Sequence, residues 1–491
     1  MEKLTINELF SGIGAQASAL EKLGIPFEIR HTSDIDHNAV LAYASIHCGL
    51  TEELINTYTE YPTREEMARQ LTEINLGYDF QKSKPYNWYR FVNSKSKELE
   101  KYWLANKLSK NLGDISKLEY LDYADFWTYS FPCTDISVAG KQEGIKHGKT
   151  RSGLLYEVQR LLERANKMLA LPKYLMLENV KNLVGKKFKP QFDEWVAWLD
   201  ELGYNTYWKV LNAKDYGVPQ NRERVFAISI RKDIDDGKFE FPQPFDNGVR
   251  LKDVLEDNVD EKYYLSEDIQ NRLIITDKTL TKNIIGTTKP SFRTIGQRDV
   301  VYSENSIMGT LVATDYKQPK QILETNRCVK VGDLNYYPYE TSNRVYSKEG
   351  ISPTLTTMQG GNTEPKIAEP IAYVKEATKK GYAEIYEGDS VNLEQPNSKT
   401  RRGRVGKGCA QTLTTSCNQA IVELETKSFR VRKLTPRECY RLMGFTDEQF
   451  DKSQAFSSDS QLYKQTGNSI VVDVLYYIFG KLFEVNIENF I

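Results

Sequence analysis

The sequence predicts an α/β protein whose core is a doubly wound, mostly parallel sheet joined to a smaller β-rich region. Strand-like runs alternate with helical stretches over residues 4–245, which is typical of a parallel sheet with helices on both faces. Beyond about residue 245 the alternation stops, and turn residues, threonines, tyrosines and short β-like runs continue to about residue 427.

The composition is that of a water-soluble chain with more than one domain or large insertions. Its 491 residues exceed one ordinary core, and 40% are hydrophobic and 27% charged. The first ten residues lack the apolar core of a signal peptide, and no segment reaches the length of a membrane span. The six cysteines show no paired pattern, and the four histidines do not stand with carboxylates at ligand spacing. We therefore expect a cytoplasmic protein with reduced thiols and no metal site.

The net charge of −1 does not identify a nucleic-acid partner, because a balanced total can hide a local basic stripe. Residues 399–407 (KTRRGRVGK) form such a stripe, with five positive residues that include Arg401, Arg402 and Arg404. A DNA contact and a solvated surface loop account for this stripe equally well.

The first predicted unit is a strand over residues 4–10, the turn Ser-Gly-Ile-Gly14 and a helix over residues 15–23. The pattern Gly-x-Gly-x-x-Ala in this turn suits a loop whose small residues let a cofactor approach the backbone. Asp34 ends the second predicted strand, where a carboxylate can bind ribose hydroxyls. Dinucleotide dehydrogenases and S-adenosylmethionine (SAM) methyltransferases share this arrangement, so it does not choose between them.

Helical, polar sequence from about residue 50 to residue 110 is predicted to be an insertion. The alternation then resumes, with strands predicted at 125–130, 174–177, 207–211 and 225–230 and helices such as 154–169 and 192–202. Asp114, ahead of the third strand, either is a third carboxylate near the cofactor or caps the turn that follows it.

Cys133 stands just beyond a predicted strand, behind Pro132. A free cysteine in this place is either an inert buried thiol or a reactive thiolate.

Glu178 follows an apolar strand, at the end where open parallel sheets bind ligands. It is therefore either a catalytic carboxylate or an ion-paired one. Arg222 and Arg224 are spaced to project to one face of an extended chain, where they can orient a thiolate, a carboxylate or a phosphate, or form surface ion pairs.

A weak repeat marks the β-rich region. Its three copies end in Thr310-Leu311, Thr354-Leu355 and Thr412-Leu413. Similar hairpins in a small β domain explain the repeat, and so does a hydroxyl-rich surface that reads bases and phosphates.

Taken together, these segments resemble the DNA cytosine-5 methyltransferases of bacteria and their phages. Six motifs follow the order of that family: Glu8 to Gly14, Phe131 to Cys133, Glu178 to Val180, Gln220 to Arg224, Arg432 to Phe445 and Gln465 to Ser469. The resemblance covers about residues 1–48, 112–245 and 428–485, and it implies a Rossmann-like SAM-dependent methyltransferase fold with an inserted target-recognition domain.

The resemblance also implies the chemistry. Cys133 would attack carbon 6 of a cytosine flipped out of duplex DNA, while Glu178 supplies a proton at ring nitrogen 3. Arg222 and Arg224 would orient these two groups and favour the thiolate. Carbon 5 would then take the methyl group of SAM.

Two sets of binding residues follow from the resemblance. The cofactor set is Phe10, Gly12, Ile13, Gly14, Asp34, Ile35, Asp114, Ile115, Pro132, Asn468 and Ser469. The DNA set is Ser137, Gln142, Arg151, Arg401, Arg402, Arg404, Thr412 and Leu413, of which the first three belong to or border a loop resembling the one that closes over the flipped base.

The implied organisation has three parts: a catalytic domain (1–246, with the insertion at about 50–110), a target-recognition domain (247–427) and a C-terminal segment (428–491) that returns to the catalytic domain. We expect a monomer with double-stranded DNA as substrate, and a restriction endonuclease as a possible genetic partner. Thr134-Asp135 depart from the family, which commonly has Gln after the catalytic cysteine. No function is predicted for the insertion.

Three other functions compete. A tRNA cytosine-5 methyltransferase would keep the chemistry, but about 180 residues of recognition region favour duplex DNA. An NAD-dependent oxidoreductase would use the glycine turn and leave Phe-Pro-Cys133 and Glu178 unexplained. A DNA-binding regulator with a decayed active site conflicts with the presence of both residues.

Overall fold

The computed structural model describes residues 3–263 and 429–485, with gaps at 80–83, 134, 137–143, 146–149 and 250, and short segments between residues 284 and 421. By compactness the chain divides into two units, one made of residues 1–322 and 433–491 and the other of residues 323–432. The functional boundaries predicted at residues 247 and 427 stay predictions.

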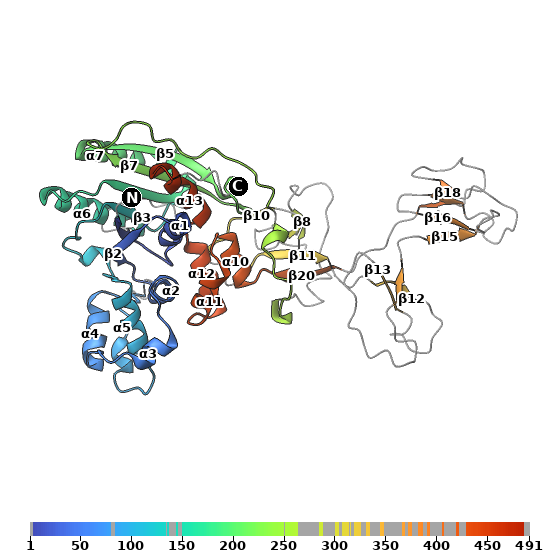
Figure 1. The fold of residues 1–491 in the computed structure, drawn as a ribbon, viewed down its shortest axis with the longest axis horizontal. Coiled ribbons are helices and arrows are strands. Elements are labelled where there is room, and N and C mark those ends of the chain that lie inside the picture. The colour runs from blue at the N-terminus through green and yellow to red at the C-terminus, as the bar shows by residue number, and fades with distance from the viewer. Residues whose placement is uncertain are drawn as a thin grey trace. The chain divides into compact units, whose positions relative to one another are not determined.

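A six-stranded sheet forms the centre of the first unit, in the order β2-β1-β3-β4-β7-β5 (Figure 1). Its strands are β1 (Leu4–Leu9), β2 (Phe27–Ser33), β3 (Phe126–Tyr129), β4 (Tyr174–Val180), β5 (Tyr204–Asn212) and β7 (Glu223–Arg231). Strands β2, β1, β3 and β4 pair in parallel, and β7 runs antiparallel to both β4 and β5. The predicted doubly wound, mostly parallel sheet is confirmed.

Helices cover both faces of the sheet because its buried strands carry apolar residues on alternating sides. Phe126 and Met176 belong to one core, together with residues of α1 (Ala15–Leu23) and α13 (Val472–Leu482). Trp127 and Leu175 belong to the other, with α6 (Leu155–Lys167) and α7 (Lys189–Leu202). Because helices cover both faces of the sheet, we expect a ligand to bind at the carboxyl ends of the parallel strands.

The residues predicted as an insertion form α3 (Glu52–Thr57), α4 (Arg64–Glu73), the 3-10 turn η1 (Trp88–Phe91) and α5 (Glu98–Leu108). They have a core of their own, in which Leu71, Trp88 and Leu104 pack with Leu41 of α2 (His37–His47). Figure 1 shows these helices beside α2, at the β2 edge of the sheet.

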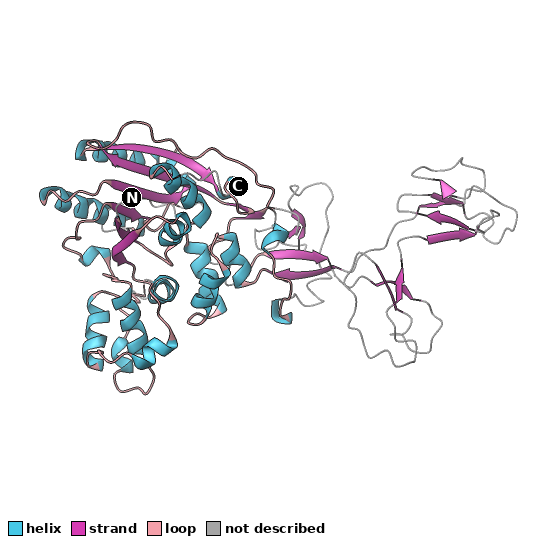
Figure 2. Ribbon diagram, viewed as in Figure 1, coloured by secondary structure: helices cyan, strands magenta, loops and turns pink. Residues whose placement is uncertain are grey.

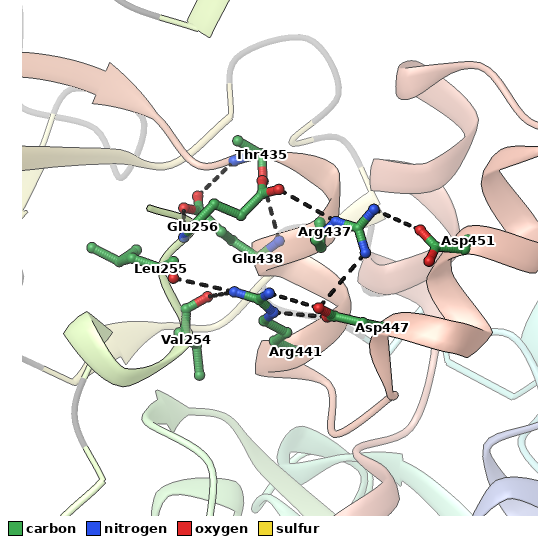
Figure 3. Close-up of polar contacts among 9 residues, drawn as sticks. All are labelled: Val254, Leu255, Glu256, Thr435, Arg437, Glu438, Arg441, Asp447 and Asp451. Carbon is green, nitrogen blue, oxygen red and sulfur yellow. Dashed lines mark hydrogen bonds and ion pairs between the residues drawn. The ribbon is translucent and has the colours of Figure 1, made fainter. Parts of the chain in front are cut away.

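The C-terminal segment adds α10 (Pro436–Leu442), α11 (Asp447–Gln454) and α12 (Asp459–Asn468), followed by α13. Its α10 is fastened to residues 254–256 by a network of charged groups (Figure 3). Arg441 donates to the carbonyls of Val254 and Leu255 at 3.2 and 3.1 Å, and the Glu256 amide donates to Glu438 at 2.8 Å. The chain therefore leaves the catalytic core and returns to it at the same place.

The described elements between residues 284 and 421 are short strands (Figure 2). The order β20-β11-β9-β8 forms one sheet, from β8 (Ile284–Thr287), β9 (Val300–Ser303), β11 (Gln321–Thr325) and β20 (Phe429–Lys433). The second unit contains β12 (Lys330–Asp333), β13 (Arg344–Ser347), β14 (Lys366–Ala368), β15 (Ala372–Lys375), β16 (Tyr382–Ile385), β17 (Ser390–Asn392), β18 (Val405–Gly406) and β19 (Gln419–Ile421). In the ranges that the structure describes, no helix is long and apolar enough to cross a membrane.

Candidate active site

Cys133 lies beyond the carboxyl end of β3, and Glu178 lies near the carboxyl end of the neighbouring strand β4, inside a strand that the sequence predicts to end at Leu177. Strands β3 and β4 pair in parallel with Tyr129 opposite Leu177, so the chain leaves both strands at the same edge of the sheet. Glu178 is 5% exposed, and its two oxygens have different partners. The Ser130 hydroxyl donates to Oε2 at 2.6 Å, and Arg224 Nε lies 3.1 Å from Oε1. The carboxylate is therefore held in one orientation.

The surroundings of Cys133 act on its thiol in opposite directions. Burial raises the pKa of the thiol, and the Glu178 carboxylate raises it too, whereas Arg224 and Arg222 lower it. Burial outweighs the two guanidinium groups, so the thiol keeps its proton more strongly than an ordinary cysteine does. The arginines act in the direction expected from the sequence without making the resting group a thiolate.

The two arginines of the Gln-x-Arg-x-Arg motif have different partners. Arg224, on β7, pairs with Glu178. Arg222 precedes β7, is 3% exposed, and donates to the carbonyls of Leu311, Ser469 and Gly467 at 2.6, 2.8 and 3.2 Å. Burial and the neighbouring Arg224 lower the pKa of Arg222 to about 9. Arg222 thus joins three segments that are far apart in the sequence.

The segment before β7, the segment around Leu311 and the end of α12 are in direct contact. β10 (Met308–Gly309) pairs in parallel with β6 (Gln220–Asn221), the Leu311 amide donates to Gln220 Oε1 at 3.1 Å, and Thr310 donates to the Asn221 carbonyl at 2.6 Å. A Cβ added at Gly467 would lie 2.2 Å from the backbone nitrogen of Ala313. The first Thr-Leu copy is therefore fixed beside the arginine motif.

The glycine turn after β1 has the backbone conformation that its sequence predicts. Phe10, Gly12 and Gly14 have φ values of 57°, 55° and 80°, in the left-handed region where glycine is unstrained. A Cβ added at Gly12 would meet nothing within 4 Å, whereas one at Gly14 would strike His47. Gly12 therefore borders open space, as a turn that receives a cofactor must.

Asp34 stands across from this turn. The Gly12 amide donates to its Oδ2 at 2.9 Å and the Asp36 amide to its Oδ1 at 2.8 Å. Burial raises the pKa of Asp34 to about 6, with a further contribution from the Asp36 carboxylate. Each carboxylate oxygen has a second acceptor position, so Asp34 can still accept bonds from ribose hydroxyls.

Asp114 caps the turn that follows it, which is one of the two roles that its sequence position left open. Its Oδ1 accepts the Ser116 amide at 2.9 Å, which caps the 3-10 turn η2 (Ile115–Lys117). Its Oδ2 accepts Nδ2 of Asn75 at 2.7 Å. Asp34 follows β2, so the chain has two acidic side chains that can accept hydrogen bonds from an adenosine group. These residue types are suited to binding SAM.

Comparison with known proteins decides the family. Residues 75–484 match the family model described as C-5 cytosine-specific DNA methylase. The chain belongs to the C-5 cytosine-specific DNA methylases. It is 33% identical over 488 residues to the Type II methyltransferase M2.ScrFI of Lactococcus lactis subsp. cremoris, covering 98% of this chain and 99% of the relative. It is 35% identical over 377 residues to the orphan methyltransferase M.SssI of Spiroplasma monobiae, covering 75% and 83%.

A phage protein is similar over the full chain. The orphan methyltransferase M.SPBetaI of Bacillus phage SPbeta is 28% identical over 550 residues, covering 100% of this methylase and 99% of the relative. The prediction of a DNA cytosine-5 methyltransferase is confirmed and is supported over the tRNA alternative. Methylases of this family use SAM in general.

The remaining predicted site residues divide into two groups. Ile13, Ile115 and Ser469 are buried, Ile35 is half-buried, and Asn468 is exposed at the end of α12. Pro132 accepts a bond from Ser152 through its carbonyl. Arg151 is exposed at the start of the 3-10 turn η3 (Arg151–Leu154). The other predicted DNA contacts lie outside the described residues: Ser137, Gln142, Arg401, Arg402, Arg404, Thr412 and Leu413.

The sequence did not reveal three residues of the methylase site. Ser130 orients Glu178, Asn75 binds Asp114, and Asn111 accepts the Asp34 amide at 2.8 Å. Ser130 could have been found, since it directly precedes Phe-Pro-Cys133 at the strand end. Asn75 and Asn111 gave no signal, because their partners are set by the packing of the insertion.

Proposed function

We propose that this methylase modifies carbon 5 of a cytosine in duplex DNA through a covalent bond between the Cys133 sulfur and carbon 6 of the base. One observation carries the proposal. Cys133 follows β3 at the edge of the sheet near which Glu178 lies in β4, and Glu178 is bound on both oxygens. Addition to a cytosine ring requires a nucleophile and a proton donor that lie close together, and Cys133 and Glu178 can supply these two groups.

The chain's own residues account for the individual steps. The Cys133 thiol gives its proton to water, and the thiolate forms the bond to carbon 6. Glu178 holds a proton at nitrogen 3, so that the electron pair of the ring becomes available at carbon 5. SAM, when bound, supplies the methyl group to carbon 5. A water molecule then takes the carbon 5 proton, the electron pair of that C–H bond forms the double bond to carbon 6, and the sulfur leaves as the Cys133 thiolate. Nitrogen 3 returns its proton to Glu178, and the aromatic ring is restored.

Arg224 assists the transfer of the proton from Glu178 to nitrogen 3 of the base. Its guanidinium neutralises the charge that develops on Glu178 when the proton moves to the base, at a separation of 3.1 Å. The same guanidinium lowers the pKa of Cys133 and so opposes the effect of burial. Arg224 therefore assists both groups, while Arg222 holds the segments around them.

For the cofactor, we propose that Asp34 binds the ribose hydroxyls and that Asp114 and Ile115 bind the adenine. The turn from Phe10 to Gly14 would carry the methionine part. The open space at Gly12 and the spare acceptor positions of Asp34 support this assignment.

We also propose double-stranded DNA as the substrate, with target recognition by residues 247–427. The names of the relatives, which include Type II and orphan methyltransferases, support DNA as the substrate. The monomeric state, the cytoplasmic location and a cognate restriction endonuclease stay predictions.

Two measurements test the proposal. Bisulfite sequencing of DNA from a methylation-free host that expresses this methylase should show protected cytosines in one sequence context. A duplex with 5-fluorocytosine at that position should then give a denaturation-resistant adduct with the wild type, because fluorine replaces the proton that must leave. An equal yield of adduct with Cys133→Ser would contradict the assignment of the nucleophile.

A further inference from the structure

We propose that the helical insertion of residues 51–110 builds one wall of the cofactor site, and that Asn75 is a positioning residue for Asp114. This inference rests on the proposed SAM site and extends it to a segment for which the sequence predicted no function. Three sets of contacts join the insertion to the residues proposed to bind adenosine.

The turn after α4 is fixed from within the insertion. Asn75 has a φ of 54°, in the left-handed region, and its amide donates to the Thr72 carbonyl at 3.1 Å. The next residue, Leu76, donates its amide to the Leu71 carbonyl at 3.1 Å and accepts Nε1 of buried Trp88 at 2.9 Å. The Asn75 side chain therefore projects from a turn whose backbone is bonded on both sides.

The first contact is with the adenine end of the site. Asn75 Nδ2 donates to Asp114 Oδ2 at 2.7 Å, and the Asp114 amide donates to the Ile74 carbonyl at 2.9 Å. A Cβ added at Gly113 would lie 2.2 Å from the Ile74 carbonyl oxygen, so the two backbones are in direct contact. A bond from an amide to a carboxylate is charge-assisted, and this one orients Oδ2 of Asp114, while the Ser116 amide and hydroxyl donate to Oδ1 at 2.9 and 2.7 Å.

The second contact is with the strand end that carries Asp34. The Gly77 amide, in the same turn, donates to the Ile35 carbonyl at 2.7 Å. This bond sets the backbone directly after Asp34.

The third contact is made by Asn111, the residue that follows the insertion, and Asn106 of α5 orients it. Asn111 Nδ2 donates to Asn106 Oδ1 at 2.9 Å and to the Asp34 carbonyl at 3.0 Å, and its Oδ1 accepts the Asp34 amide at 2.8 Å. The insertion thus contacts the chain at both Asp34 and Asp114, the two carboxylates proposed to bind one adenosine group.

The role of Asn75 is one of position. The side-chain amide of Asn75 donates to Asp114 Oδ2. The second acceptor position of that oxygen can still accept a bond from a ligand. Asn75→Asp keeps the size and the tolerance for a positive φ, but it places a second carboxylate against Asp114. Asn75→Gly keeps the backbone conformation and removes the side chain.

The test is calorimetric titration of the full-length protein with S-adenosylhomocysteine, followed by steady-state kinetics. Asn75→Asp should weaken binding by about tenfold or more and Asn75→Gly by a few-fold, because Oδ2 of Asp114 loses its donor and the Asp variant adds a repelling charge. The KM for SAM should rise in parallel, while kcat at saturating SAM and the KM for DNA stay within about twofold of wild type. The matched control is Asn93→Asp, an exposed position in the same insertion, which should bind like wild type.

The outcomes are distinct. Wild-type affinity in Asn75→Asp would overturn the inference while leaving the SAM site in place. Failure of the wild type to bind S-adenosylhomocysteine would overturn the SAM site and this inference with it. If Asn75→Asp unfolds in circular dichroism without ligand, Asn75→Gly decides: unchanged affinity and unchanged KM for SAM would overturn the inference.

Discussion

Arg224 Nε lies 3.1 Å from Glu178 Oε1, and this ion pair joins β7 to β4 at the edge where Cys133 leaves β3. Glu178 is bound by Ser130 on its other oxygen. The pair therefore presents a carboxyl group in one orientation beside the thiol. The first three predictions below test this relationship from its different sides.

Replacing the nucleophile should separate binding from chemistry. Cys133→Ser should abolish methyl transfer, because a hydroxyl is a far weaker nucleophile than a thiolate. Binding of S-adenosylhomocysteine and of target DNA should persist, since the change is nearly isosteric. Transfer of a labelled methyl group measures the first and calorimetry the second. Full activity in this variant would remove Cys133 from the mechanism.

Replacing the acid should slow the chemical step. Glu178→Gln still accepts the Ser130 hydroxyl but cannot supply a proton to nitrogen 3, so kcat should fall by about 10²–10⁴-fold. Single-turnover kinetics at saturating SAM and DNA measure this effect. Glu448→Gln, which alters an exposed carboxylate paired with Lys452 on α11, serves as the control and should have wild-type rates. Normal turnover in Glu178→Gln would count against its role as an acid.

The reactivity of Cys133 should depend on pH and on its two charged neighbours. Its raised pKa means that the thiolate fraction grows as pH rises, so alkylation by iodoacetamide should accelerate with pH up to that pKa. Glu178→Gln removes a charge that raises the pKa and should speed alkylation at pH 7.5. Arg224→Met removes one that lowers it and should slow alkylation.

Peptide mass spectrometry separates Cys133 from the other thiols in this experiment. Burial raises the pKa of Cys48 to about 12 and also raises that of Cys439, so both should react slowly and identically in all variants. Equal rates at Cys133 in the two variants would show that Glu178 and Arg224 do not act on the thiol.

Removing the buried guanidinium should destabilise the protein. Arg222→Met leaves the carbonyls of Leu311, Gly467 and Ser469 without that donor, and each unsatisfied buried group costs about 1–3 kcal/mol. We expect the free energy of unfolding in urea to fall by roughly 3 kcal/mol or more. Arg30→Met, which removes an exposed guanidinium paired with Glu28, is the control and should cost about 1 kcal/mol or less. An unchanged urea midpoint in Arg222→Met would contradict the bridging role.

Much of this site could be predicted because it depends on strand ends. A strand followed by a turn can be read locally, so Cys133, Glu178, Gly12 and Asp34 could each be placed at the carboxyl edge of the sheet. The order of the motifs then supplied the chemistry.

What could not be predicted depends on partners far along the chain. Arg222 was expected beside the thiol, but its guanidinium binds main-chain carbonyls, which leave no mark in side-chain identity. The first Thr-Leu copy is fixed by Gln220 and Arg222, although the three copies look alike in sequence. The contact of Asn75 with Asp114 likewise depends on how the insertion packs.

The network of Figure 3 has a consequence for changes in the length of the chain. Arg437 pairs with Glu256 at 3.3 Å and with Asp451 at 2.6 Å, and Arg441 pairs with Asp447 at 2.7 Å while binding the carbonyls of Val254 and Leu255. These contacts hold residues 254–256 close to α10 and α11. The first and last residues of the stretch from 256 to 435 therefore lie near each other. The entropy of closing a loop rises only slowly with its length. Changes of length within residues 323–432 should therefore cost little stability, whereas Thr310 and Leu311 must be kept because Asn221, Gln220 and Arg222 bind them.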